Sequence, residues 1–244
     1  MGCSGLNASL RDWKTDTALI VAMRAAGAAY YGAGIRLDGM EDSFSTVKGA
    51  LRRRALARRR LTGLEERREA GESLARRFPA QLLAPGATVA AYVSMGSEIE
   101  TRPLLEWLLA QGCRVLVPRL GSGLEIGWSA LGSVDALRPA DGIASADSGK
   151  QHHRPDEPKA DVLPPEALGE ADLIIAPALA VDMHGVRLGR GAGWYDQALS
   201  WRKTGCPLIA VCWPWEVSES NLPSEPHDVP ADGVLTPEGY RRFR

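Results

Sequence analysis

The apolar run at residues 171–182, ADLIIAPALAVD, limits the folds open to this chain more than any other segment. An apolar run that lacks the alternation of a half-exposed strand is typical of a strand buried on both faces of a parallel sheet. A glycine-rich stretch and then a helix-like segment follow it directly. We therefore expect 171–182 to form a central strand of an α/β sheet.

Strand-like and helix-like segments alternate along the chain from residue 45 onward. Runs of small and β-branched residues predict strands, and leucines at helical spacing predict helices. The expected strands cover 87–95, 113–120, 124–131, 171–182, 207–216 and 231–237. The expected helices cover 45–61, 62–78, 101–112 and 194–205. This alternation predicts a three-layer, Rossmann-like α/β fold with a mostly parallel sheet and helices on both faces.

Local signals place several boundaries. The sequence TGLE at 62–65 has the form of a capping box, which predicts that Thr62 starts the second helix. Gly112 has the position of a helix stop at the end of the third helix. Residues 132–169 are rich in Gly, Pro, Asp and His, and we expect a long loop that covers a site.

The first 44 residues differ from the rest of the chain. They are rich in Ala and Gly and end in turn-forming residues. We interpret 1–44 as a loosely attached N-terminal extension and 45–244 as a single α/β catalytic domain. Met40, just ahead of the first strong helix, is an alternative start of the protein.

Charge and composition limit the classes of partner that we expect this protein to bind. The net charge is −1 and 24% of residues are charged, so no strong field favours nucleic acid or membrane. No apolar run of about 18 residues is present, and the four cysteines have no metal-binding spacing. We expect a cytoplasmic, monomeric protein that acts on small molecules, without a nucleic-acid or membrane partner.

The glycine-rich stretch GVRLGRGAGWYD at 185–196 is the strongest candidate site. Glycines let backbone N–H groups approach a phosphate, and the start of the following helix adds partial positive charge. Arg187 and Arg190 offer guanidinium donors, and Asp196 offers an oxygen ligand for a metal. The pattern is neither a Walker A loop nor G-x-G-x-x-G. Phosphate binding is the preferred interpretation, and a structural glycine-rich turn is the alternative.

Two other function classes stay open. A dinucleotide-dependent α/β enzyme would use the same glycine loop, although its usual fingerprint is missing. A nucleic-acid binder would use the arginine-rich helix, although several glutamates follow it closely, namely Glu65, Glu66, Glu69 and Glu72.

Four segments, in order, resemble the 5-formyltetrahydrofolate cyclo-ligase family. GVRLGRGAGWYD resembles the family signature G-x-R-L-G-x-G-x-G-Y-Y-D, with Trp194 in place of the first tyrosine. KGALR at 48–52, YVSMGSEIET at 92–101 followed by VLVPRL, and HDVPADGVLTP at 227–237 are similar to the other family segments. The resemblance covers about residues 45–237. One segment, KQHHRPDEP at 150–158, departs from the aromatic and Gly-Ile-x-x-Pro-like pattern that encloses the pterin, which leaves an inactive family relative as an alternative.

The resemblance implies an ATP- and Mg²⁺-dependent cyclisation of 5-formyltetrahydrofolate to 5,10-methenyltetrahydrofolate. ATP phosphorylates the formyl oxygen, N10 attacks the activated carbon, and phosphate leaves. Such a reaction needs charge neutralisation and alignment rather than a protein nucleophile.

The resemblance also implies roles for particular residues. The ATP-binding residues would be Lys48, Arg52, Arg187, Gly189, Arg190, Gly191, Ala192, Gly193, Trp194 and Tyr195, with Lys48 and Arg190 catalytic. The folate-binding residues would be Val93, Glu98, Arg190, Gly191, Ala192, Gly193 and Trp194. The Mg²⁺ ligands would be Asp196 and Asp228. Glu100 is a second candidate for the role of Glu98, since both acids share one face of an extended segment.

Overall fold

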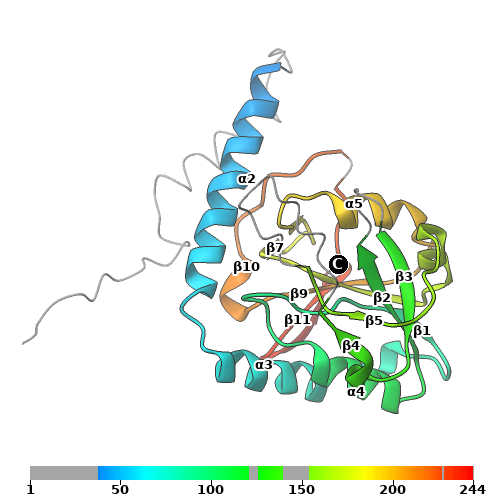
Figure 1. Ribbon diagram of the computed structural model, residues 1–244. Coiled ribbons are helices and arrows are strands. Elements are labelled where there is room, and N and C mark those ends of the chain that lie inside the picture. The colour runs from blue at the N-terminus through cyan, green and yellow to red at the C-terminus, as the bar shows by residue number, and fades with distance from the viewer. Residues whose placement is uncertain (1–37, 121–125, 140–153, 227, 244) are drawn as a thin grey trace, which may run out of the picture.

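A seven-stranded sheet runs through the centre of the molecule. The computed structural model describes residues 38–120, 126–139, 154–226 and 228–243. The strand order is β12–β11–β9–β6–β1–β2–β3 (Figure 1). The strands are β1 (Thr88–Ala90), β2 (Arg114–Leu120), β3 (Ile126–Leu131), β6 (Leu173–Pro177), β9 (Leu208–Val211), β11 (Gly233–Thr236) and β12 (Gly239–Arg242). The five inner strands are parallel, and the edge strands β3 and β12 are antiparallel to their neighbours. Strand β6 is central, which confirms the prediction from the run at 171–182.

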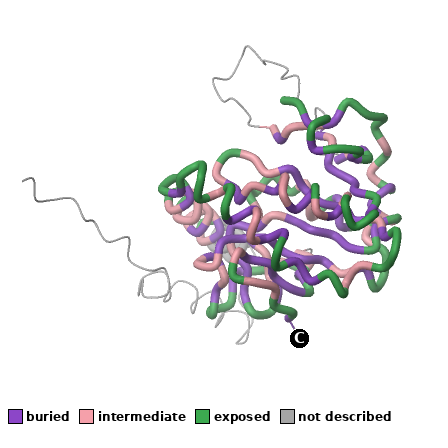
Figure 2. Tube along the Cα trace, turned by 90° about the horizontal axis from the view of Figure 1, so that it is seen from below, coloured by how far each residue is buried: buried purple, intermediate pink, exposed green. Residues whose placement is uncertain are grey.

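Both faces of this sheet are buried. Val89, Val115 and Ile175 point to one face and pack with α3 (Leu64–Arg76) and α4 (Arg102–Ala110). Ala90, Leu116, Ile174 and their neighbours point to the other face, against η4 (Pro165–Glu170), α5 (Trp194–Ala198) and η5 (Leu199–Trp201). Figure 2 shows buried strands inside a rim of exposed turns. The three-layer α/β prediction is confirmed, although the described helices that pack on the second face are short.

The N-terminal helix starts earlier than expected. Helix α2 spans Asp38–Arg59, so it begins seven residues before the predicted start at residue 45. The boundary expected between residues 44 and 45 therefore lies inside a helix. Residues 1–37 lie outside the described residues, and the separation of an N-terminal extension stays a prediction.

The capping-box prediction at 62–65 is wrong. Gly63 caps α3 without any side-chain hydrogen bond. The Thr62 hydroxyl instead donates to the carbonyl oxygen of Arg59 at 2.7 Å, so it closes the end of α2. Gly112 has a φ of +76° at the end of α4, which confirms its role as a helix stop.

The apolar run at 171–182 forms two strands rather than one. After β6 ends at Pro177, the chain leaves the large sheet, and β7 (Ala180–Asp182) pairs with β8 (Arg187–Leu188) and β10 (Val217–Ser218) in a small second sheet. Proline has no N–H to continue a ladder, and Leu179 N donates to Leu188 O at 2.7 Å instead. The strands β8, β10 and β12 were not predicted from the sequence.

The stretch at 132–169 contains short elements where a single loop was expected. They are η3 (Val134–Ala136), β4 (Leu137–Arg138), β5 (Glu157–Pro158) and η4, and residues 140–153 lie outside the described residues. The two remaining short helices are η2 (Ala80–Leu82) and η6 (Pro214–Glu216). Within the described ranges, no helix is long and apolar enough to cross a membrane.

Gly71 marks a close approach of α3 to the segment that follows β1. A Cβ atom built on Gly71 would lie 2.0 Å from the carbonyl oxygen of Glu100. We expect Gly71→Ala to destabilise the protein by about 1–3 kcal/mol, because one of the two backbones must move. Chemical denaturation measures this change in unfolding free energy.

Gly49→Ala in α2 is the matched helix control. Its Cβ would meet only Arg53 Nη1, at 3.5 Å, so the higher helix propensity of alanine should raise stability by up to about 1 kcal/mol. Equal effects of the two substitutions would contradict the close approach at Gly71.

Candidate functional site

The main cavity lies at the carboxyl ends of the parallel strands. The chain leaves β1 toward β2 on one side and returns to β6 on the other, so the strand order reverses between β1 and β6. In open α/β sheets, the loops diverge at such a switch point and leave a crevice for ligands. A cavity of about 390 Å³ opens there, lined by the segments after β1 and β6, by β2, by the glycine loop and by α2.

The structure brings all of the sequence-predicted site residues except the second candidate acid, Glu100, to this cavity. Its lining includes Lys48, Arg52, Val93, Glu98, Arg187, Gly189, Arg190, Gly191, Ala192, Gly193, Trp194, Tyr195, Asp196 and Asp228. Glu100 does not line it, because its carboxylate accepts hydrogen bonds from Ser94 Oγ and Arg102 N. Glu98 is therefore the acid of this segment that faces the cavity. The roles of the lining residues stay predictions.

Helix α2 contributes one stripe of cations to the cavity. Lys48, Arg52 and Arg59 all line it, at spacings of four and seven residues that place them on one helix face. Arg52 Nε donates to the carbonyl oxygen of Gly189 at 3.0 Å, which ties the helix to the glycine loop. Sequence reasoning missed Arg59, although its spacing from Lys48 and Arg52 carried the signal.

The glycine loop enters the cavity from a hairpin. It follows β8 rather than the central strand, which differs from the sequence expectation. Gly191 and Gly193 have φ angles of +97° and +72°, a region that side chains with a Cβ rarely adopt. The helix that follows, α5, has five residues, so its dipole contributes little. Side-chain cations therefore supply most of the positive charge.

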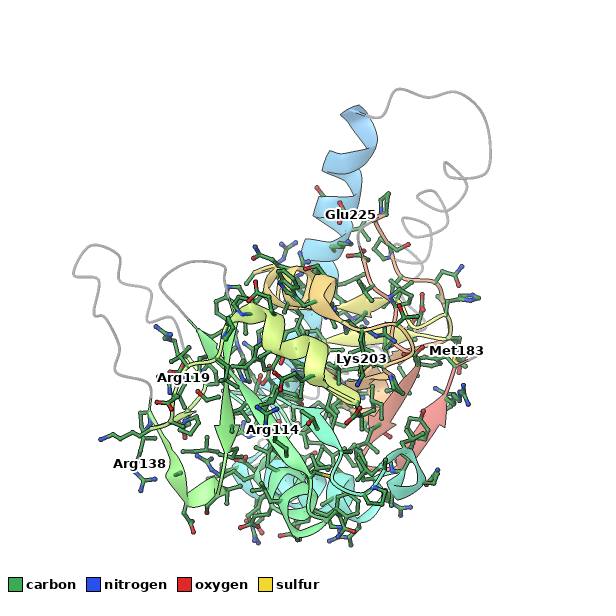
Figure 3. The ribbon with its side chains drawn as sticks, turned by 90° about the vertical axis from the view of Figure 1, so that its right-hand side faces the viewer. Arg114, Arg119, Arg138, Met183, Lys203 and Glu225 are labelled. Atoms are coloured by element: carbon green, nitrogen blue, oxygen red, sulfur yellow. The ribbon has the colours of Figure 1, made fainter. Side chains whose placement is uncertain are left out.

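Four ion pairs hold Lys48, Arg187 and Arg190 in place. Lys48 Nζ lies 2.5 Å from Glu225 Oε2 and 2.9 Å from Asp228 Oδ2. Burial opposes the charged form of Lys48, but the hydrogen bonds to these carboxylates outweigh it and raise the pKa of the lysine. Figure 3 shows Glu225 beside α2, on a strand-to-strand connection from the far end of the sequence.

The other two pairs lie on the glycine loop. Arg187 Nη2 lies 2.9 Å from Asp196 Oδ1, and Arg190 Nε lies 3.0 Å from Glu98 Oε1. Glu98 also accepts from the Met95 backbone N–H at 2.9 Å, and its side chain is only 5% exposed. Arg190 thus connects the glycine loop to the segment after β1.

Two buried polar atoms of the cavity wall have no hydrogen-bond partner among the residues that the structure describes. They are Arg187 Nε and the Tyr195 hydroxyl. Burial raises the pKa of Tyr195, so the hydroxyl keeps its proton and stays a donor. Buried donors in native proteins are almost always satisfied, so these two atoms are exceptions in the cavity wall.

The charge balance of the lining favours an anionic ligand. Five cationic side chains and three carboxylates line the cavity: Lys48, Arg52, Arg59, Arg187 and Arg190 against Glu98, Asp196 and Asp228. Clustered arginines with planar guanidinium groups suit phosphate oxygens in particular.

The carboxylates fit a magnesium ion that arrives with a nucleotide. In the described part of the chain, no group of three or more His, Cys, Asp or Glu residues forms a metal cage. Mg²⁺ commonly keeps several waters and binds through one or two carboxylates plus substrate phosphates. Asp196 and Asp228 offer two such carboxylates in the lining of one cavity.

Apolar side chains also line the cavity, and sequence reasoning missed most of them. They are Tyr92, Met95, Pro118, Leu120, Ile126, Pro155 and Pro177. Pro155 belongs to the segment that departs from the family pattern, and its neighbour Asp156 binds Arg102 Nη2. His152 and His153 lie outside the described residues, while His184 is exposed in a turn and does not line the cavity.

Comparisons with known proteins agree on one family. The model of the 5-formyltetrahydrofolate cyclo-ligase family matches residues 44–237. A protein named 5-formyltetrahydrofolate cyclo-ligase from Mycolicibacterium smegmatis is 40% identical over 191 residues, which cover 76% of this chain and 92% of that protein. Its namesake from Escherichia coli is 33% identical over 189 residues, covering 74% and 94%.

Solved structures agree with these sequence matches. The structure of Aquifex aeolicus 5,10-methenyltetrahydrofolate synthetase is similar with a TM-score of 0.63 and 27% identity, covering 81% of this chain and 93% of that one. The synthetase structure from Mycoplasma pneumoniae has a TM-score of 0.58 at 20% identity, covers 78% of this chain and 98% of that one, and shows a shared fold.

Proposed function

The chain belongs to the 5-formyltetrahydrofolate cyclo-ligase family, and we propose that it uses ATP and Mg²⁺ to close 5-formyltetrahydrofolate to 5,10-methenyltetrahydrofolate. The observation that carries the proposal is that one cavity is lined by five cationic side chains, by a buried carboxylate and by apolar side chains. The cations suit a triphosphate, and the apolar side chains suit a flat heterocycle.

ATP would bind along α2 and the glycine loop. Lys48, Arg52 and Arg187 would exchange their present carboxylate and carbonyl partners for phosphate oxygens. Each exchange replaces one hydrogen bond of the cation by another, so these cations need little further desolvation when the phosphates bind.

The folate would bind between the segment after β1 and β2. Tyr92, Val93 and Pro118 provide apolar contacts for a pterin ring. The Glu98 carboxylate, anchored by the Met95 N–H, would accept hydrogen bonds from ring N–H groups. Its second partner, Arg190, lies between this region and the phosphate side, which is where the two substrates must react.

The reaction would proceed by phosphoryl transfer followed by ring closure. The formyl oxygen attacks the γ-phosphorus, the bond to ADP breaks, and a phosphorylated formyl group forms. N10 then attacks the formyl carbon, the N10 proton is lost, and phosphate departs with the C–O bond electrons. Arg190 and Lys48 would neutralise charge on the transferring phosphoryl group, which is the main catalytic demand of such a transfer.

Magnesium would be held by Asp196 and Asp228 together with phosphate oxygens. The ion would supply charge neutralisation at the phosphates. Without ligand, Asp196 and Asp228 are bound to Arg187 and Lys48, and they would become available to the ion as these cations turn to the phosphates.

Direct observation of the product tests this function. Purified protein with ATP, Mg²⁺ and 5-formyltetrahydrofolate should show a growing absorbance of methenyltetrahydrofolate. The rate should vanish when ADP replaces ATP. Absence of product with all three components would refute the proposal, as would an equal rate without nucleotide.

Substitution of a proposed metal ligand tests the role of magnesium. We expect Asp196→Asn to lower kcat/KM by about 100-fold at limiting Mg²⁺ and to recover in part at high Mg²⁺, because an anionic oxygen ligand is lost. The asparagine oxygen can still accept from Arg187, so the melting temperature should change little.

Asp172→Asn is the matched control. Asp172 pairs with Lys203 in an exposed position just before β6, at the opposite end of the strands from the cavity. Its activity should respond to Mg²⁺ as the wild type does. The same response for Asp196→Asn would remove Asp196 from the metal site.

A further inference from the structure

A buried ion pair joins the end of α2 to the body of the sheet. Arg59 Nε donates to Glu216 Oε1 and Arg59 Nη2 donates to Glu216 Oε2, both at 2.7 Å. The two side chains are each only 3% exposed. Nη2 also donates to the carbonyl oxygen of Ala178 at 2.6 Å. This network has the planar, two-bond geometry that arginine forms best.

The pair connects three segments that are distant in the sequence. Arg59 is the last residue of α2, Ala178 follows β6, and Glu216 ends η6 after β9. Glu216 is itself fixed, since its Oε2 accepts from the Trp213 N–H at 3.0 Å. One guanidinium therefore holds the end of α2 against the carboxyl ends of two central strands.

The same helix face carries the proposed ATP ligands. Lys48 lies three turns before Arg59, about 16 Å along the helix axis, and Arg52 lies two turns before it. Figure 1 shows the N-terminal part of α2 extending past the body of the molecule, so the orientation of the helix depends on contacts made by its middle and its C-terminal end.

ATP binding would leave Arg59 as the fixed polar contact of this stripe. Lys48 and Arg52 would exchange their present partners for phosphates, whereas Arg59 is bound to groups that the ligand does not replace. Apolar contacts of Leu51 with Leu179 and Leu222 also hold the helix, but such contacts are non-directional and specify register weakly.

We propose that Arg59 and Glu216 form a positioning pair, which orients α2 so that Lys48 and Arg52 stay in register with the nucleotide. The pair does not act on the reacting atoms. This inference rests on the proposed function for its consequence in ATP binding, but the geometry of α2 can be tested without ATP.

A purely structural role makes a different prediction. Replacement of a buried ion pair by apolar residues of similar size is often neutral or stabilising, whereas removal of one partner is costly. If the pair mattered for stability alone, an apolar pair would therefore restore normal function. If the pair positions α2, the apolar pair should restore part of the free energy of unfolding but not the register of α2 with the nucleotide.

The test compares the single variant Glu216→Gln, the conservative variant Arg59→Lys and the double variant Arg59→Met with Glu216→Leu, all in the full chain. We expect the double variant to regain part of the melting temperature lost by Glu216→Gln, because it leaves no unpaired buried charge, although the Ala178 carbonyl and the Trp213 N–H each lose a hydrogen bond. Its KM for ATP should stay raised by about tenfold or more, with a smaller change in kcat, because ground-state nucleotide contacts are weakened. Arg59→Lys should raise the KM less, since it keeps the charge but loses the fork.

Hydrogen exchange of the α2 amides gives the readout that needs no ligand. Amides of residues 46–59 should exchange faster in the double variant than in the wild type at a temperature well below melting. A double variant with the wild-type KM for ATP and wild-type exchange would overturn the positioning role. If that variant does not fold, a wild-type KM in Arg59→Lys overturns it instead.

Arg114→Gln with Glu170→Gln is the control for loss of an ion pair. That pair is exposed and ties the start of β2 to η4, away from the cavity, and Figure 3 shows Arg114 well separated from Glu225. Its KM for ATP should match the wild type. If the wild type itself lacks ATP-dependent cyclisation, the proposed function fails. Hydrogen exchange of the α2 amides then tests the positioning pair by itself.

Discussion

Gly191→Val is expected to weaken ATP binding by at least about 100-fold, because the valine would occupy space that the loop needs for Arg52 and a phosphate. Gly191 has a φ of +97°, and a Cβ built there would lie 3.1 Å from the Arg52 guanidinium carbon. The substitution therefore strains the backbone and displaces a cation of the proposed nucleotide site. Calorimetric titration with ATP measures this loss of affinity.

Gly205→Val separates strain from site disruption. Gly205 has a φ of +81°, yet a Cβ at that position meets no atom within 4 Å. Both variants should lose stability from the unfavourable φ, by roughly 1–3 kcal/mol. Only Gly191→Val should lose ATP affinity. Normal ATP binding by Gly191→Val would reduce the glycine loop to a structural turn.

Arg190→Ala is expected to lower kcat by about 100-fold, which corresponds to about 3 kcal/mol of transition-state stabilisation. Arg190 bridges the glycine loop and Glu98 at 3.0 Å, so it lies between the proposed phosphate and folate regions. Removal of its charge also leaves the buried Glu98 with one fewer donor, and a stability loss of roughly 1 kcal/mol should accompany the kinetic effect. Turnover assays at saturating substrates and thermal denaturation measure the two effects.

Arg190→Lys is the conservative variant for this prediction, and Lys203→Ala is its control. Lysine keeps the charge but cannot reproduce the guanidinium fork, so Arg190→Lys should recover only part of kcat. Lys203 pairs with Asp172 at an exposed position, and Lys203→Ala should turn over normally. Normal turnover by Arg190→Ala would exclude a role for this side chain in phosphoryl transfer.

Local chemistry allowed much of the fold to be predicted. The run at 171–182 identified the central strand because a strand buried on both faces must be apolar throughout. Gly112 identified a helix end because its positive φ costs least without a Cβ. Both features depend on the residues themselves and on their immediate neighbours.

Other local signals misled where a partner in another element decided the outcome. The capping-box prediction at 62–65 failed because the Thr62 hydroxyl donates to the carbonyl oxygen of Arg59 at the end of α2. The apolar run divides at Pro177 because the chain beyond it pairs with β8 in a second sheet. Two competing hydrogen-bond partners cannot be ranked from sequence when one of them belongs to another element.

The candidate site shows the same division between sequence and tertiary structure. The glycine pattern and the family motifs selected residues such as Arg190 and Asp228, since a phosphate needs donors and a metal needs oxygens. The sequence by itself thus determined the central strand, the chemistry of the loop and the family. Tertiary structure alone decided that Glu98 meets Arg190 across 92 positions, that Glu225 holds Lys48, and that Arg59 is buried against Glu216. The physical reason is that ion pairing and burial depend on distance in space, which parallel strands set by bringing their carboxyl ends together at one edge of the sheet.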